Sequence, residues 1–167
     1  SPEWKSYQEE FRALVAEKFG DSRARQLPRG LQQVWIKELE RVDRCITCHQ
    51  GIEWKGMDNA PHPFKAHPRE ILQKHPVQQF GCTVCHGGQG YATETESAHG
   101  FVKHWEEPLL GKQLRELYLV KDKKALMEMN CNRCHRYERE SKGADYINRA
   151  KQLIQEKGCR ACHTING

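Results

Sequence analysis

Cysteine and histidine recur along this chain in a fixed pattern, Cys-x-x-Cys-His, which occurs four times and includes all eight cysteines. Two thiols at this spacing can form thioethers with the two vinyl groups of one haem, and the adjacent imidazole can bind its iron. The sequence therefore predicts four covalently attached c-type haems, each with its iron held by the histidine of the motif. The predicted cofactor-binding residues are Cys45, Cys48 and His49; Cys82, Cys85 and His86; Cys131, Cys134 and His135; and Cys159, Cys162 and His163.

Two other uses of paired cysteines fit the pattern less well. Pairs of Cys-x-x-Cys can form all-thiolate zinc sites, and eight cysteines can form a disulfide framework. Neither use requires a histidine directly after the second cysteine. The chain has 9 histidines among 167 residues. At that frequency, four such coincidences would arise by chance at a rate on the order of 10⁻⁵. The repeated histidine therefore favours haem.

Five further histidines are candidates for the sixth ligand on the opposite side of each iron. Three of them precede proline, which biases the backbone toward an extended conformation outside a helix interior. Their number permits bis-histidine, low-spin coordination throughout. The methionines at positions 57, 127 and 129 are the other candidate ligands, although packing on a helix face is the alternative interpretation for them. The predicted distal iron ligands are His67, His75, His99 and His104, with His62 as a further candidate.

The fourth motif differs from the others because no spare histidine lies near it in the sequence. All five candidates lie between residues 51 and 105, and only four residues follow His163. Its sixth ligand must then come from the earlier loop region, from a methionine, from another chain, or from sequence beyond Gly167.

The composition favours a fold built around its cofactors. Hydrophobic residues make up 37% of the chain and the mean hydropathy is −0.88, which is low for a chain that must build its own core. Large apolar haems would supply the missing surface. The formal net charge of +5 falls to roughly +1 with four oxidised bis-histidine haems and to roughly −3 when they are reduced. The basic residues therefore do not indicate nucleic acid, and they offset haem propionates or form a partner-docking patch.

Helices are expected at the two ends of the chain and irregular structure in the middle. Apolar spacing predicts helices over residues 2–19, 31–43, 112–129 and 145–157, with Pro2 in the first turn and Gly20 and Gly158 as stops. Prolines and glycines predict extended loops and single turns over residues 51–111, and no strand is evident. No apolar run is long enough to span a membrane or form a signal sequence.

The expected fold class is mainly α with extensive irregular loops, built around a packed haem array with little or no β structure. We expect an N-terminal helical segment over residues 1–43 and a loop-rich core with three haems over residues 44–144. Residues 145–167 would form the helix and motif of the fourth haem. The end helices would cover haems, with docking to a partner or membrane surface as the alternative.

Several short runs around the motifs form a recognisable pattern: Val42-Asp43-Arg44-Cys45, the His-Pro pairs, residues 80–90, Ala98-His99-Gly100 and His104-Trp105. The pattern resembles bacterial multihaem (tetrahaem) c-type cytochromes, similar to electron-transfer subunits that work beside membrane quinol-oxidising complexes. Residues 145–167 also resemble the start of a class I cytochrome c domain, whose methionine ligand normally lies far downstream. Because the chain stops at Gly167, we expect a fragment or cleavage product.

The resemblance implies an electron carrier rather than an enzyme. Four haem c groups would relay electrons from a membrane quinol-oxidising complex or another donor to a periplasmic or extracellular acceptor. Covalent haem attachment implies assembly outside the cytoplasmic membrane, in the periplasm or at the cell surface. Two alternatives remain: a subunit of a polymeric extracellular cytochrome filament formed by self-association, and a multihaem reductase with one open haem.

Overall fold

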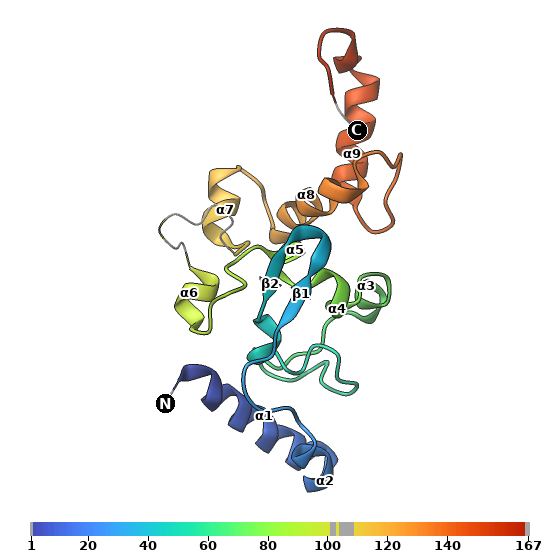
Figure 1. Ribbon diagram of the computed structural model, residues 1–167. Helices are drawn as coiled ribbons and strands as arrows, with labels where there is room; N and C mark the ends of the chain where they lie inside the picture. The colour runs from blue at the N-terminus through green and yellow to red at the C-terminus, as the bar shows by residue number, and fades with distance from the viewer. Residues whose placement is uncertain (1, 101–102, 104–108, 166–167) are drawn as a thin grey trace. The chain divides into compact units, whose positions relative to one another are not determined.

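The computed structural model describes residues 2–100, 103 and 109–165. It divides the chain into two compact units, Ser1–Leu109 and Leu110–Gly167, which are described separately below (Figure 1). Helices are the main regular structure in both units, and a single two-stranded sheet is the only one in the described residues. The predicted mainly α class with extensive loops is confirmed. The predicted division into an N-terminal helical segment, a three-haem core and a fourth-haem segment stays a prediction.

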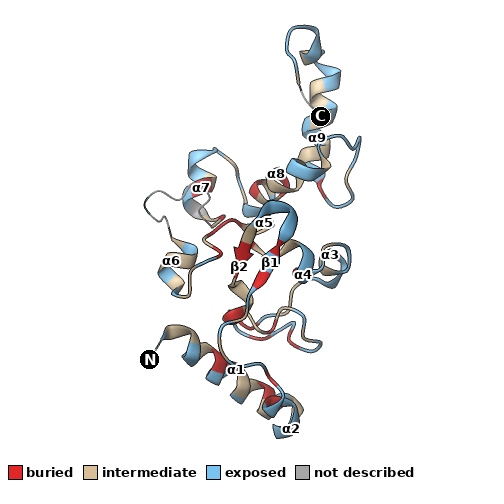
Figure 2. Ribbon diagram, in the orientation of Figure 1, coloured by how far each residue is buried: buried red, intermediate tan, exposed pale blue. Residues whose placement is uncertain are grey.

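The first unit begins with the predicted amphipathic helix, α1 (Glu3–Phe19), followed by the short α2 (Asp21–Arg25). Pro2 lies at the N-cap position just before α1, and Gly20 ends the helix with a φ of 90°. The buried residues of α1 recur at helical spacing, Gln8, Phe11 and Val15, so one face of this helix packs inward (Figure 2).

A β-hairpin replaces the helix predicted over residues 31–43, so that prediction and the expectation of no strand were wrong. Strand β1 (Val34–Ile36) pairs antiparallel with β2 (Arg41–Asp43), in a register that sets Trp35 opposite Val42. Val34 and Ile36 are buried while Trp35 between them is exposed, which is the two-residue period of a strand. The 3-10 turn Lys37–Leu39 joins the strands.

In the described residues between 51 and 111 the helices are short, as predicted. They are α3 (Arg69–Lys74), α4 (Val77–Phe80), α5 (Thr83–His86) and α6 (Thr95–His99). Pro68 and Pro76 precede α3 and α4, where a missing backbone N–H has no cost. Irregular segments connect these single turns, so tertiary contacts must hold them in place.

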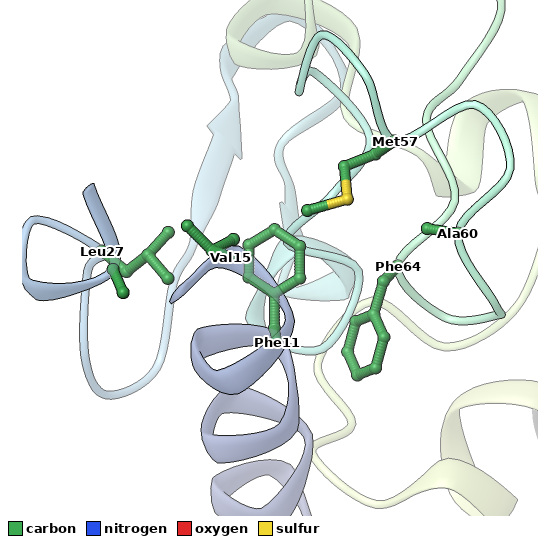
Figure 3. Packing of buried hydrophobic residues seen from close by; sticks show 7 residues of the cluster. Phe11, Val15, Leu27, Met57, Ala60 and Phe64 are labelled. Atoms are coloured by element: carbon green, nitrogen blue, oxygen red, sulfur yellow. The ribbon is translucent and has the colours of Figure 1, made fainter. Parts of the chain in front are cut away.

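Two clusters of buried side chains stabilise the first unit. Phe11 and Val15 of α1 pack with Met57, Ala60 and Phe64 from the loop region, as Figure 3 shows. The rings of Phe11 and Phe64 lie 5.4 Å apart. A smaller cluster joins the hairpin to α4 through its buried residues Val34, Ile36 and Val77. Met57 is fully buried in the first cluster, which makes it a core residue.

The described part of the second unit contains the helices α7 (Lys112–Leu117), α8 (Lys123–His135) and α9 (Asp145–Glu156), followed by the 3-10 turn Cys159–Ala161. The helix predicted over residues 112–129 is interrupted, because Leu119 adopts a left-handed φ of 54° and Asp122 starts a new helix by accepting a bond from the N–H of Ala125 at 3.0 Å. Helix α9 and its stop at the left-handed Gly158 match the prediction.

Candidate haem-binding sites

Each Cys-x-x-Cys-His motif forms about one helical turn. The first, second and fourth lie in the 3-10 turn Cys45–Thr47, in α5 and in the 3-10 turn Cys159–Ala161, and the third ends α8. In three motifs the histidine N–H donates to the carbonyl of the first cysteine, at 2.9 Å for His49, 3.0 Å for His86 and 3.0 Å for His163. Residues three and four apart share a face of such a turn, so both thiols and the imidazole point to one side.

The cysteines fit thioether attachment better than the alternatives. All eight are free thiols, so no disulfide framework forms. Across the described residues, the only close group of three candidate metal-binding side chains is Asp43, Cys45 and Cys82, which offers two thiols where an all-thiolate zinc site needs four. Paired thiols beside an imidazole match the donor set of covalently bound haem c.

The first motif's histidine faces a histidine from a distant element. The ring centres of His49 and His99 lie 5.9 Å apart, at an interplanar angle of 63°. Two imidazoles on opposite sides of one metal ion, each with a metal–nitrogen bond of about 2 Å, have ring centres about 6 Å apart. The pair is therefore spaced as two axial ligands of a single iron would be.

The second motif has a matching partner. The ring centres of His67 and His86 lie 6.1 Å apart and their planes are nearly perpendicular, at 89°. His67 comes from the loop before α3, whereas His86 ends α5. Two of the predicted distal histidines, His67 and His99, thus lie opposite the proximal histidines of the first two motifs.

The other candidate ligands have different surroundings in the described residues. The Nδ1 atom of His75 lies 3.1 Å from the carbonyl oxygen of Ile71, and its ring packs against Phe80 at 5.1 Å. His62 is exposed, and His104 lies outside the described residues. In the second unit, the described residues contain no histidine besides His135 and His163. The sixth ligands of the third and fourth motifs stay predictions.

Acceptors orient several of the imidazole rings, as ligating histidines require. His49 is bonded to the backbone of Pro63, and the Nδ1 atom of His67 lies 3.1 Å from the carbonyl oxygen of Pro68. The Nδ1 atom of His135 lies 2.6 Å from a carboxylate oxygen of Glu138. Burial, together with His99, lowers the pKa of His49, which favours the neutral ring that binds metal.

Asp43 connects the first two motifs. Its carboxylate accepts bonds from the N–H groups of Cys45 at 3.1 Å, Cys82 at 2.7 Å and Thr83 at 2.8 Å, and its side chain is buried. Burial raises its pKa, but the Cys45 thiol and these N–H groups outweigh burial and hold the pKa of Asp43 below its ordinary value. Sequence reasoning missed this role; the signal was an aspartate, a preferred capping residue, just before a turn.

The position before the second motif requires glycine. Gly81 has a φ of +63°, and a Cβ atom there would lie 2.6 Å from Ile36 Cδ1 and 2.8 Å from Asp43 Oδ2. Only a residue without a side chain lets Cys82 and Thr83 approach the carboxylate this closely. In the free-thiol form, a hydrogen bond with Cys82 raises the pKa of the neighbouring Cys45 thiol, and burial and Asp43 raise this pKa further.

In the second unit, polar contacts connect α8, which carries the third motif, to α9, which leads into the fourth. The buried carboxylate of Glu128 accepts a bond from the N–H of Ile147 at 3.0 Å. The Nζ atom of Lys151 donates to the carbonyl oxygens of His135 at 2.8 Å and Glu138 at 2.7 Å. These bonds fix the end of α8 against α9 and place Glu138 beside the His135 ring.

These features are similar to those of c-type cytochromes. A family model described as cytochrome c554 and c-prime matches residues 92–164, a stretch that includes His99 and the third and fourth motifs. The match supports a c-type cytochrome with covalently bound haem c and electron transfer by haem. Comparison with curated proteins and with solved structures gave no match. In the described residues no helix is both long and apolar enough to cross a membrane.

Proposed function

We propose that this chain transfers electrons through four covalently bound c-type haems, one at each Cys-x-x-Cys-His motif. The observation that carries the proposal is the spacing of two histidine pairs, His49 with His99 at 5.9 Å and His67 with His86 at 6.1 Å. Each pair would hold an iron from both sides. Haem c supplies a reversible one-electron iron couple when bound, and the residues set its ligation and surroundings.

The arrangement of the first two motifs favours transfer between neighbouring sites. The sulfur atoms of Cys45 and Cys82 lie within 4.8 Å of each other, so the attachment points of the first two haems are adjacent. Asp43 fixes both motifs through its three N–H contacts. A short, fixed distance between the two haems suits an electron carrier, because electrons pass directly between the haems and no substrate has to enter between them.

A carrier is favoured over a reductase for the first two sites because a histidine lies on both sides of each proposed iron position. A reductase needs one open face with proton-donating groups above it. Self-association remains a second candidate. The observation that favours it is the second unit, whose described residues contain two motifs but no further histidine, so a neighbouring chain is one source of the missing ligands.

The site of action and the partners follow from the class of protein. Proteins with covalent haem c are assembled outside the cytoplasm, and we place this chain in the periplasm or at the cell surface. Its donor would be a membrane quinol-oxidising complex or another redox protein. The basic side chains would offset haem propionates or contribute to docking.

Intact mass and electron paramagnetic resonance of the oxidised protein test the proposal. We expect a mass with four haems and low-spin signals from six-coordinate irons. A mass with fewer haems would overturn the four-haem assignment. A high-spin haem that binds cyanide or nitrite in the native protein would favour the reductase instead.

A further inference from the structure

The first turn of α1 is bonded to the first residue of α6. The carboxylate of Glu3 accepts one bond from the N–H of Thr95 at 2.8 Å and another from its hydroxyl at 2.7 Å. The hydroxyl of Tyr7, one turn further along α1, donates to the same carboxylate at 3.2 Å. The N–H and hydroxyl of Thr95 hold the pKa of Glu3 below its ordinary value, so the carboxylate is ionised at neutral pH.

Helix α6 begins at Thr95 and ends at His99, so it is only five residues long. A helix of this length is not stable by itself in water, and contacts with the rest of the protein must fix its position. Two contacts in the described residues contribute to this: the N–H of Gln89 donates to the carbonyl of Ala98 at 3.1 Å, and Glu3 binds Thr95 at the opposite end of the helix. The position of the His99 ring therefore depends on α1.

Helix α1 also contacts the segment that carries His49, on the other side of the proposed iron position. The side-chain amide of Gln8 is buried and donates to the carbonyl of Thr47, inside the first motif, at 3.1 Å. The hydroxyl of Thr47 in turn bonds the backbone of Gln32, at 2.9 Å for both the N–H and the carbonyl. Helix α1 thus contacts the segment that carries His49 through Gln8 and the segment that carries His99 through Glu3.

The segments that carry His49 and His99 would differ in how firmly they are attached to the haem. The His49 loop would be tethered by the thioether bonds of Cys45 and Cys48, whereas His99 has no covalent connection to the cofactor. Loss of a contact on the His49 side therefore leaves the proximal ligand in place. Loss of the contact on the His99 side releases the sixth ligand.

We propose that α1 is a latch on the sixth coordination position of the first haem, with Glu3 as the positioning residue that holds His99 against the iron. The inference rests on the proposed pairing of His49 with His99. It adds that the openness of this haem is controlled by the N-terminal helix. Any partner or modification that lifts the start of α1 would open the site to a small ligand.

The expected size of the effect follows from the population of the open form. Carbon monoxide binds only a ferrous haem whose sixth position is free, so its apparent affinity is proportional to the fraction of protein in which His99 is released. Glu3 is partly exposed, so solvent weakens each of its hydrogen bonds relative to those of a buried charge. We expect Glu3→Ala, which removes several of these bonds at once, to raise the apparent affinity of one haem for carbon monoxide about threefold to tenfold.

The experiment compares Glu3→Ala with Glu9→Ala, an exposed glutamate on the same helix, and with His99→Ala as the reference for a fully open haem. The haem-loaded proteins are titrated with carbon monoxide when reduced and recorded by electron paramagnetic resonance when oxidised. We expect a new high-spin signal in Glu3→Ala and His99→Ala, absent in Glu9→Ala. Added imidazole should convert that signal back to low spin.

The outcomes separate the latch from the proposed function. If His99→Ala opens one haem but Glu3→Ala stays fully closed, the latch is wrong and the ligand pair stands. If His99→Ala opens no haem, the proposed pairing itself is wrong. Should Glu3→Ala yield no folded protein, Thr95→Val removes the hydroxyl that contacts Glu3 and Tyr7 but keeps the N–H bond to Glu3. This variant must then show a smaller rise in carbon monoxide affinity, and an unchanged affinity would overturn the latch.

Discussion

Replacement of Asp43 by asparagine removes a charge and one acceptor without changing the size of the side chain. Three N–H groups point at this carboxylate, one at Oδ1 and two at Oδ2. With the asparagine oxygen in the Oδ2 position, its NH₂ group would face the N–H of Cys45, so two donors would meet. The first two haem motifs would lose the group that joins them.

The cost can be worked out contact by contact. Loss of a hydrogen bond to a charged group costs about 1.5–3 kcal/mol. Each of the two remaining bonds changes from charge-assisted to neutral, which costs about 1 kcal/mol because charge-assisted bonds are roughly twice as strong. Relief from burying a charge offsets about 1–2 kcal/mol of this sum. We therefore expect Asp43→Asn to lower the free energy of unfolding by about 1.5–4 kcal/mol.

The effect should depend on pH in a defined direction. Despite burial, the N–H bonds from Thr83, Cys82 and Cys45, which do not depend on the Cys45 thiol, hold the pKa of Asp43 below its ordinary value in the folded protein. The carboxylate therefore stabilises the fold fully above the unfolded pKa of about 4. This contribution disappears as the pH falls through the lower, folded pKa. The difference in stability between the native protein and Asp43→Asn should be constant from pH 5 to 8 and shrink below about pH 4.

Urea unfolding of the haem-loaded protein, followed by circular dichroism, measures this difference. Asp58→Asn is the matched control, since Asp58 is exposed and should change stability by less than about 0.5 kcal/mol. If the free energy of unfolding of Asp43→Asn lay within about 0.5 kcal/mol of the native value, the estimate from the three N–H contacts would be refuted. A difference that persisted undiminished to pH 3 would refute the assignment to a carboxylate.

Three further substitutions test separate parts of the structure. Glu138→Gln removes the carboxylate beside the third motif's imidazole and should raise one midpoint potential by about 60 mV, a tenfold change for one electron; redox titration measures it, and unchanged potentials would contradict the role. Gly81→Ala forces a methyl group against Asp43 and should cost about 1–3 kcal/mol more in urea unfolding than Gly20→Ala, where φ is also positive but the space is empty; equal costs would argue against crowding. Met57→Leu should leave every midpoint potential unchanged and cost less than about 1.5 kcal/mol, because Met57 packs in the core; a shifted potential would identify it as a ligand.

The proximal half of each site could be predicted from the sequence because it is local. Two cysteines and a histidine at positions i, i+3 and i+4 share one face of any helical turn, whatever surrounds them. The structure accordingly forms such a turn at the first motif within a 3-10 segment and at the third within α8. The sequence also limited the distal candidates to a few histidines, among them His67 and His99, but it did not pair them.

The hairpin shows where local reasoning fails. Val34 and Val42 lie on one predicted helical stripe, yet the same residues also alternate in the two-residue period of short strands. Two tertiary contacts decide between the helical and the strand pattern. Val34 and Ile36 pack against α4, and Asp43 must end β2 where its carboxylate meets the second motif. A window of sequence contains neither contact, so the strands could not be predicted from it.

The distal half of each site is a property of the whole fold, and this difference has a functional consequence. His49 is fixed by its own turn, whereas His99 is fixed by a five-residue helix that α1 holds in place. If His99 is the sixth ligand, as we propose, a change anywhere along that chain of contacts would alter this ligand without touching the attachment motif. Reduction potential and access to small ligands would both depend on it. Motifs that are identical in pattern could then hold haems that differ, because the contacts around the distal ligands differ.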